Sequence, residues 1–294
     1  MQSVSNKAPP NQLAYDYIRS LVHQHAAIVI NKDQDYLIDS RVEQVLTSQG
    51  ISSFDELVSL LDNNPFGQLH QCVVTAFTVK ETSFFRDSHV FDVLKRQILP
   101  QLFQKKTAEK KINIWCAACS YGQEAYSLAM LIHEMLMKYH HWSVELIASD
   151  ISSQALEKAQ QGIYSNLEVQ RGLKPWLQKK YFTQTPEGWH VHDEIRRMVT
   201  FKQINIADSW PTLSCMDIVL MRNLLIYFDA EAKKRVLNRI AKIIHPDGYL
   251  FVGAAETIID LDSPFQLISP NNIVYYQLDK TKGVKKNNVT YSNY

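Results

Sequence analysis

The stretch INIWCAACSYGQEAYSLAM, residues 112–130, decides the fold class of this chain. Its first five residues form a short apolar run, and from Gln123 onward the apolar residues recur at helical spacing. A turn at residues 120–122 separates the two patterns. A strand that leads directly into a helix is the repeating unit of a parallel β-sheet.

The same alternation continues toward the C-terminus. We expect further strands at residues 143–150, 216–221 and 248–255, and helices at residues 152–164 and 230–244. The last strand follows an expected turn, HPDG. Nearly unbroken apolar strands are buried on both faces, so the sequence predicts an α/β domain whose parallel sheet is covered by helices on both sides.

The remaining segments have different patterns. Helical spacing dominates residues 12–62, and Phe91, Leu94, Ile98 and Leu102 mark one face of an amphipathic helix. A Pro-Glu-Gly turn in KKYFTQTPEGWHV predicts a small antiparallel insertion. The predicted divisions are an all-helical domain at 1–78, a linker and connecting helix at 79–105, the α/β domain at 106–285 with the insertion at about 178–202, and a flexible tail at 286–294.

Composition excludes several classes of function. The 294 residues carry a net charge of +1, so no global field attracts nucleic acid. The polar start lacks the apolar core of a signal peptide, and no apolar run approaches the roughly 18 residues of a membrane span. We therefore expect a cytoplasmic protein that neither inserts into a membrane nor binds nucleic acid.

Four cysteines, Cys72, Cys116, Cys119 and Cys215, are too few for a secreted disulfide framework. The pair Cys116-x-x-Cys119 resembles a redox motif, but the first cysteine of such a motif starts a helix, whereas Cys116 closes a strand. A structural zinc site needs four ligands, and no second close pair exists. We expect no metal, and interpret the cysteines as small side chains in a tight loop.

Ligands of open parallel sheets bind beyond the carboxyl ends of the strands. The loop there has one glycine, Gly122, and lacks the G-x-G-x-x-G pattern that admits a pyrophosphate. Glu124 would repel phosphate but accept hydrogen bonds from an ammonium group, and Asp150 ends the next strand where an acid commonly binds ribose. The ligand that fits is S-adenosylmethionine (SAM). Two simpler roles stay open: Glu124 as a partner of the helix dipole, and Asp150 as a helix N-cap.

Several motifs in this order resemble the CheR-type chemoreceptor glutamate O-methyltransferase family. The resemblance covers residues 12–280 and rests on ETSFFRD, CSYGQEAYSLAM, ASDIS with GIYS, FKQIN, MRNLLIYFD and HPDGYLFVGAAET. It implies an all-helical N-terminal domain that recognises the receptor, a Rossmann-like SAM-dependent methyltransferase domain, and a small antiparallel β subdomain inserted into it.

The resemblance also implies roles for individual residues. The cofactor-binding residues it indicates are Thr82, Arg86, Glu124, Asp150, Asn205, Ile206, Arg222 and Asn223. Tyr227 and Arg86 are the catalytic candidates, with Tyr227 nearer the transferred methyl and Arg86 mainly on the cofactor carboxylate. A buried Arg222 needs a partner, and we expect a carboxylate of cofactor or substrate. Phe84 and Phe85 are expected to pack between domains, and Tyr227 has a packing role as its alternative.

The implied reaction transfers the methyl of SAM to glutamate carboxylates of chemoreceptor cytoplasmic helices and leaves S-adenosylhomocysteine. We expect a monomer. Lys80 replaces a common Asn, Gln123 a common Glu, and Glu43, Gln44 and Val45 stand where relatives often have arginines. The short turn of the insertion predicts independence from the receptor's C-terminal pentapeptide. The alternatives are a SAM-binding regulatory protein and a methyltransferase with another substrate.

Overall fold

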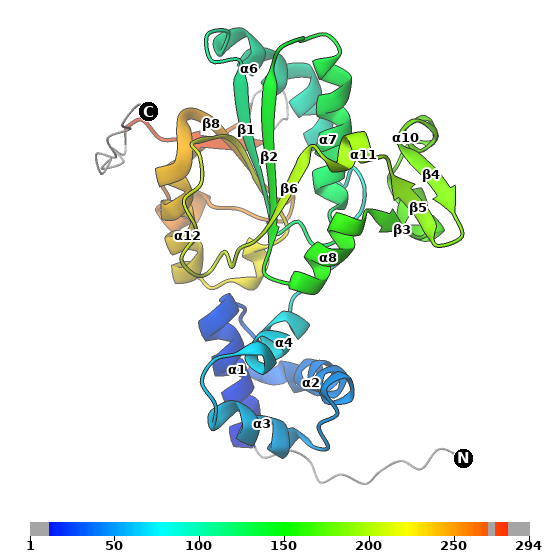
Figure 1. Ribbon diagram of the computed structural model, residues 1–294. Helices are drawn as coiled ribbons and strands as arrows, with labels where there is room; N and C mark the ends of the chain where they lie inside the picture. The colour runs from blue at the N-terminus through cyan, green and yellow to red at the C-terminus, as the bar shows by residue number, and fades with distance from the viewer. Residues whose placement is uncertain (1–11, 270–273, 282–294) are drawn as a thin grey trace. The chain divides into compact units, whose positions relative to one another are not determined.

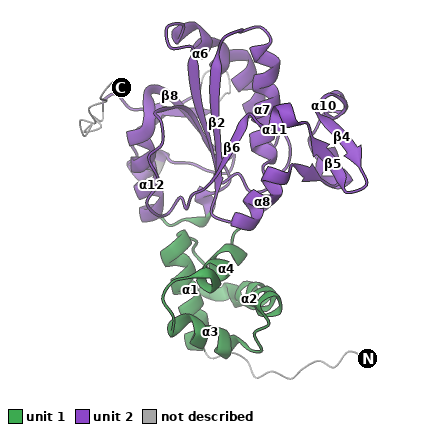
Figure 2. Ribbon diagram, in the orientation of Figure 1, with its two compact units in different colours: residues 1–79, 227–229 green, residues 80–226, 230–294 purple. Residues whose placement is uncertain are grey.

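The computed structural model describes residues 12–269 and 274–281, and the tail predicted at 286–294 lies outside them. The chain divides into two compact units (Figure 2). Unit 1 contains residues up to Val79 together with Tyr227–Asp229, and unit 2 contains Lys80–Ile226 and the residues from Ala230 onward.

Unit 1 is helical, as predicted for residues 12–62. Its helices are α1 (Gln12–Ala26), α2 (Asp35–Gln49), α3 (Phe54–Asp62) and α4 (Gln68–Ala76). Ile18, Val22, Ile38 and Leu57 are buried in its core. The Ser53 hydroxyl caps α3 by accepting a hydrogen bond from the backbone N–H of Glu56 at 3.1 Å, which satisfies one of the free donors at the helix start.

The segment Tyr227–Asp229 packs in unit 1 although the chain on both sides of it belongs to unit 2. Ile28 and Phe228 form an antiparallel bridge, and the backbone N–H of Val29 donates to the carbonyl of Tyr227 at 2.9 Å. His23 and Asp229 make a side-chain contact of 2.6 Å. Both strand-type pairing and a polar contact therefore fasten this segment to α1 and the residues after it.

Unit 2 is built on a seven-stranded sheet in the order β6-β2-β1-β7-β8-β10-β9. The strands are β1 (Lys111–Ala117), β2 (Ser143–Asp150), β6 (Val199–Gln203), β7 (Met216–Met221), β8 (Ile244–Val252), β9 (Phe265–Ile268) and β10 (Tyr275–Leu278). The five strands from β6 to β8 are parallel, and β10 is antiparallel to both neighbours. The predicted parallel sheet is confirmed, and β10 and β9 extend it through antiparallel pairing.

Helices cover both faces of this sheet (Figure 1). The chain steps from β1 to β2 through α7 (Gln123–Leu136) and from β7 to β8 through α12 (Ala230–Ile243). These steps run in opposite directions along the sheet, so right-handed crossovers place the two helices on opposite faces. The point where the order reverses, between β1 and β7, is where an open sheet of this kind binds its ligand.

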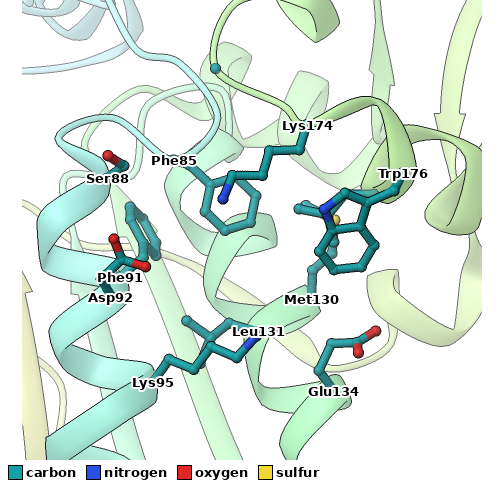
Figure 3. Close-up of a pocket in the computed structure, with 12 residues that line it drawn as sticks. Phe85, Ser88, Phe91, Asp92, Lys95, Met130, Leu131, Glu134, Lys174 and Trp176 are labelled. Atoms are coloured by element: carbon teal, nitrogen blue, oxygen red, sulfur yellow. The ribbon is translucent and has the colours of Figure 1, made fainter.

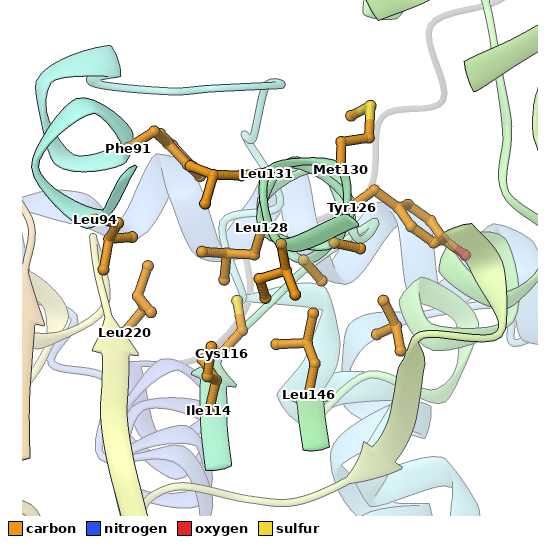
Figure 4. Close-up of a cluster of buried hydrophobic side chains, with 14 of the residues drawn as sticks. Phe91, Leu94, Ile114, Cys116, Tyr126, Leu128, Met130, Leu131, Leu146 and Leu220 are labelled. Carbon is orange, nitrogen blue, oxygen red and sulfur yellow. The ribbon is translucent and has the colours of Figure 1, made fainter. Parts of the chain in front are cut away.

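The connecting helix predicted from Phe91, Leu94, Ile98 and Leu102 is present, and all four residues are buried. It runs as α5 (Ser88–Val93), a π-helical turn (Leu94–Ile98) and α6 (Leu99–Lys105). Phe91 and Leu94 pack with residues of α7, β1, β2 and β7 in one apolar cluster (Figure 4). The start of α7 is therefore held by buried contacts on the sheet.

Two of the expected elements need correction. The helix expected at residues 152–164 ends at Gln161, because Gly162 takes a left-handed φ of +66°, and Ile163–Tyr164 form strand β3. The HPDG segment is an irregularity within β8, where the pairing with β7 shifts register between Met216 and Ile218. A local irregularity inside a strand looks like a turn in sequence.

The insertion also differs from the predicted bounds of about 178–202. Its sheet has the order β3-β5-β4, with β4 (Phe182–Thr185) and β5 (Gly188–Val191) forming the predicted hairpin. It therefore takes in β3, together with the short helices α9 (Asn166–Gln170) and α10 (Pro175–Tyr181) between β3 and β4. Residues 199–203 instead belong to the large sheet, because β6 pairs with β2.

Phe84 packs the insertion onto the rest of unit 2, in agreement with its predicted packing role. Its fully buried ring meets Tyr164 and Phe182 edge to face, with centroids 5.0 and 5.5 Å apart. Gly172 lies against the Phe84 carbonyl so closely that a Cβ would be 2.0 Å from the oxygen. Across the described residues, no helix is long and apolar enough to cross a bilayer.

Candidate active site

The loop between β1 and α7 has an unusual backbone. Ala118, Ser120 and Gly122 all have left-handed φ angles, of +57°, +51° and +87°. This region costs free energy for residues other than glycine, and such residues persist where the surrounding structure holds them. The helix begins at Gln123, as the sequence predicts.

Hydrogen bonds fix this loop to two neighbouring segments. The Cys119 N–H donates to the Ser149 carbonyl at 2.8 Å, which ties the loop to the end of β2. The Ser120 hydroxyl donates to the carbonyl of Lys80 at 2.9 Å, which ties it to the segment that enters unit 2. The backbone conformation of this loop is therefore fixed by hydrogen bonds to its neighbours within the protein.

Asp150 ends β2 and faces the same loop. Its Oδ2 accepts from the Ser120 N–H at 2.8 Å and its Oδ1 from the Ser152 N–H at 2.9 Å. Burial raises the pKa of the Asp150 carboxyl, and these hydrogen bonds oppose the rise. The N-cap of the following helix α8 (Ser153–Gln161) is Ser152, so the simpler capping role of Asp150 is wrong. Each carboxylate oxygen retains capacity to accept a further bond from a hydroxyl.

Arg222 follows β7 and forms the centre of a buried ion cluster. Its side chain is 1% exposed, and its Nη1 pairs with Glu124 Oε2. Its Nη2 donates to Asp87 Oδ2 at 2.5 Å and to the carbonyl of Arg86 at 3.0 Å. Burial lowers the pKa of Arg222, but the two carboxylates outweigh it and the pKa is raised. The protein's own carboxylates therefore already pair with Arg222, and a further partner from cofactor or substrate stays a prediction.

Glu124 is held from its other side by a cysteine. The Cys116 thiol donates to Glu124 Oε1 at 3.1 Å. Burial, and then the charge of Glu124, raise the pKa of Cys116 well above its ordinary value, and burial does the same for Cys119. Disulfide exchange needs a thiolate, so this environment opposes a redox role. The simpler role of Glu124 as a dipole partner alone is also wrong, because Glu124 belongs to an ion pair.

The Arg86 segment is also strained and clamped. Phe85 and Asp87, on either side of Arg86, have left-handed φ angles of +49° and +54°. The Phe85 N–H donates to the Ser127 hydroxyl of α7 at 2.9 Å. The half-buried Arg86 guanidinium donates through Nη1 to the carbonyl of Glu81 at 3.0 Å. The segment is therefore fixed from β7 by Arg222 and from α7 by Ser127.

The chain after β7 is organised by a carboxylate from the chain after β8. Glu256 accepts from the Asn223 N–H at 2.9 Å, the Ile226 N–H at 3.1 Å and the Gly253 N–H at 2.5 Å. Asn223 itself is left-handed, with φ +59°. A glycine is needed at position 253 because the side chains of Asn223 and Glu256 approach its backbone closely. A Cβ there would be 2.7 Å from both Asn223 Nδ2 and Glu256 Oε2.

The structure brings most of the predicted site residues to one edge of the sheet. Glu124 and Arg222 meet in the ion cluster, and Arg86 joins it through its backbone carbonyl. Ile204, after β6, donates its N–H to the Asp150 carbonyl at 3.1 Å, so Asn205 and the buried Ile206 follow directly beside Asp150. Thr82 is half-buried four residues before Arg86. Tyr227, in contrast, is counted with unit 1.

The predictions did not include four residues that support the site: Asp87, Cys116, Ser127 and Glu256. Asp87 and Glu256 lie inside the motifs ETSFFRD and HPDGYLFVGAAET, so an unassigned acid within a motif was the available signal. Cys116 and Ser127 carry no such signal, since small buried side chains are common in strands and helices.

A separate pocket of about 100 Å³ lies beside α7 (Figure 3). None of the predicted site residues lines it. Phe85 extends into it next to Phe91, with ring centroids 5.0 Å apart, and so anchors the residue before Arg86. Its other lining residues are Ser88, Asp92, Lys95, Met130, Leu131, Glu134, Gly172, Lys174, Trp176 and Leu177.

Together, these features define a class of protein. Asp150 is buried at the end of β2, and the Glu124 side chain at the start of α7 is 13% exposed. Without phosphate-binding glycines, these carboxylates suit the ammonium and ribose of SAM better than a pyrophosphate. The fold and site are those of a Rossmann-like SAM-dependent methyltransferase. The chain belongs to the CheR methyltransferase family: the family's all-alpha domain matches residues 13–78, and its SAM-binding domain matches residues 80–274.

Individual relatives agree over nearly the whole chain. The chain is 37% identical over 267 residues to chemotaxis protein methyltransferase 1 of Pseudomonas aeruginosa, covering 90% of this chain and 97% of that protein. It is 35% identical to chemotaxis protein methyltransferase Cher2 of Pseudomonas putida, with 90% and 98% coverage. It is 36% identical to chemotaxis protein methyltransferase 1 of Vibrio cholerae, with 90% and 95% coverage.

Proposed function

We propose that this protein transfers the methyl group of SAM to glutamate side chains of chemoreceptor cytoplasmic helices. The observation that carries the proposal is the match of both family domains, in order, to a chain whose relatives are chemotaxis methyltransferases. The proposed location is the cytoplasm, where this part of a receptor lies. The product would be a glutamate methyl ester.

The proposed reaction needs no general acid or general base from the protein. A glutamate carboxyl has an ordinary pKa of about 4.3, so at neutral pH it is already an ionised nucleophile. Its oxygen bonds to the methyl carbon as the carbon–sulfur bond breaks, and the electron pair stays on sulfur, so no proton moves. Holding the reacting atoms in line can supply on the order of 7–11 kcal/mol.

The residues at the sheet edge suit this task. Glu124 is the proposed partner of the cofactor ammonium, Arg86 of its carboxylate, and Asp150 of its ribose, while Thr82, Asn205, Ile206, Arg222 and Asn223 complete the proposed cofactor site. When bound, SAM supplies the electrophilic methyl and the leaving sulfur. Tyr227 is the proposed residue nearest the methyl. A guanidinium on the acceptor oxygen would stabilise the ground state, so Arg86 is better placed on the cofactor.

The direct test is incubation with methyl-labelled SAM and receptor cytoplasmic fragments. Label that becomes bound to the fragment and is released by mild base indicates carboxyl esters, and a fragment with its acceptor glutamates changed to glutamine is the control. Cofactor binding without any transfer would support the regulatory alternative. Labelling of other cell proteins, independent of unit 1, would support a different substrate.

Receptor recognition by α2 should differ from that of arginine-rich relatives. Glu43 and Gln44 are exposed on this helix, Arg41 is half-buried and Val45 is buried. Because this face carries Glu43 and Gln44 in place of arginines, it suits a receptor helix that is less acidic than those recognised by arginine-rich relatives. Otherwise, another face of unit 1 recognises the receptor. Competition by synthetic receptor helices of opposite charge distinguishes these two cases.

We also propose that transfer is independent of a receptor's C-terminal pentapeptide. The support is the short connection in the insertion, where β4 and β5 are joined by Pro186 and Glu187 alone. Equal transfer rates to full-length and tail-truncated receptors are expected. Tight binding of the isolated tail peptide would overturn this proposal without affecting the methyltransferase assignment.

A further inference from the structure

We infer that Arg222, Asp87 and Cys116 form a positioning device that holds Glu124 and the Arg86 segment together for the amino acid end of the cofactor. The inference rests on the proposed roles of Glu124 and Arg86. It assigns Arg222 an action through these two residues, in addition to its place in the proposed cofactor site.

Both oxygens of Glu124 are engaged by buried donors. Arg222 Nη1 bonds Oε2, and the Cys116 thiol bonds Oε1 at 3.1 Å. Cys116 is fully buried and its thiol pKa is raised, so it remains protonated and donates. With a donor on each oxygen, the carboxylate plane is fixed, and its remaining acceptor positions keep one direction. Such preorganisation is what an ammonium ligand requires of its acceptor.

The second half of the guanidinium holds the Arg86 segment. Arg222 Nη2 donates to Asp87 Oδ2 and to the Arg86 carbonyl. Left-handed φ angles at Phe85 and Asp87 are costly, so this segment would relax without an external clamp. A planar guanidinium can bind both groups at once, whereas a lysine ammonium is a single point charge.

Arg222 therefore ties Glu124, the proposed partner of the cofactor ammonium, to the backbone of Arg86, the proposed partner of the cofactor carboxylate. Neither Glu124 nor the backbone at residues 86–87 can shift without disturbing a bond to Arg222. The device predicts a selective effect: disturbing it weakens binding of the amino acid end and leaves the adenosine end alone, because Asp150 is held by the backbone N–H groups of Ser120 and Ser152.

Calorimetry with two ligands tests this. S-adenosylhomocysteine has the amino acid end, and 5′-methylthioadenosine lacks it. For Arg222→Lys, Asp87→Asn and Cys116→Ala, we expect the Kd of S-adenosylhomocysteine to rise about 10-fold or more, as for a lost bond to a charged group. The Kd of methylthioadenosine should change less than about 2-fold, since its contacts with the protein are unchanged. Cys116→Ser retains a donor and should restore part of the loss.

Asp92→Asn, an equivalent change at an exposed position of α5, is the matched control and should alter neither ligand. Equal weakening of both ligands would show only a general loss of structure and overturn the inference, as would no weakening of either. If the unmodified protein binds the two ligands equally, the proposed roles of Glu124 and Arg86 fail instead. Circular dichroism identifies any variant that does not fold.

Discussion

Arg222, directly after β7, forms a buried ion pair with Glu124, at the start of α7 and 98 positions earlier in the chain. The pair joins the two strands at which the sheet order reverses, because β1 leads into α7 and pairs with β7. The same guanidinium reaches Asp87. Local backbone strain and buried charge are thus concentrated where the cofactor of this family is proposed to bind.

Arg222→Ala should destabilise unit 2 strongly. It leaves Glu124 and Asp87 without a counter-charge, and removing one partner of a buried pair costs about 3–5 kcal/mol. All five tryptophans lie in unit 2, so their fluorescence during urea unfolding reports on this unit.

The matched control for that experiment is Arg171→Ala. Arg171 pairs with Glu81 at the surface, where both side chains are 59% exposed, and exposed pairs contribute little. Its urea midpoint should stay at that of the unmodified protein. Equal shifts in the two variants would contradict the importance of the buried cluster.

Glu256→Ala should disturb the chain after β7. Three backbone N–H groups lose their acceptor, at a cost of about 1–3 kcal/mol for each donor that stays buried and unpaired. We expect a lower thermal midpoint together with a lower transfer rate, because the segment leads into Tyr227. Glu256→Gln retains one carbonyl oxygen, so its thermal midpoint and transfer rate should fall between those of the unmodified protein and those of Glu256→Ala. A rate unchanged by Glu256→Ala would exclude this organising role.

Unit 2 should lose stability in alkaline solution. The pKa values of Cys116 and Cys119 are raised well above the ordinary 9.0, mainly by burial, and that of Tyr164 well above 10.0. Above about pH 9 the unfolded chain releases protons that the folded chain retains, so the unfolding free energy falls as pH rises and is intact below that pH.

Urea midpoints measured from pH 7 to pH 10.5 check this sign. Alkylation provides a second measurement: the exposed Cys215 should react first, and Cys116 and Cys119 only after unfolding. Rapid native-state labelling of Cys116 would show that its thiol is neither buried nor protonated as described.

Tyr227→Phe should lower turnover more than cofactor affinity. The ring is kept and the hydroxyl is removed, so a role close to the transferred methyl should affect the chemical step. Single-turnover transfer to a receptor fragment and calorimetry with S-adenosylhomocysteine separate the two effects. Unchanged turnover would remove Tyr227 from the mechanism and favour its packing role.

Some errors in the sequence prediction have local physical causes. Gly162 ended a helix early because its left-handed φ is open to glycine at little cost, and β3 then began at once. The HPDG segment has turn composition, but pairing with β7 keeps it within β8. In both places tertiary pairing overrode a local preference.

The amino-acid sequence by itself determined the alternation of strands and helices, the helical first unit, and the positions of Glu124 and Asp150. These follow from periodicity and from where a residue falls at a helix start or strand end, which are local properties. Only the tertiary structure decided what Glu124 and Arg222 bond to, that Glu256 organises the chain after β7, and that Tyr227–Asp229 pack with unit 1. Such pairings join residues far apart in the chain, and their geometry depends on how the strands order themselves in the sheet.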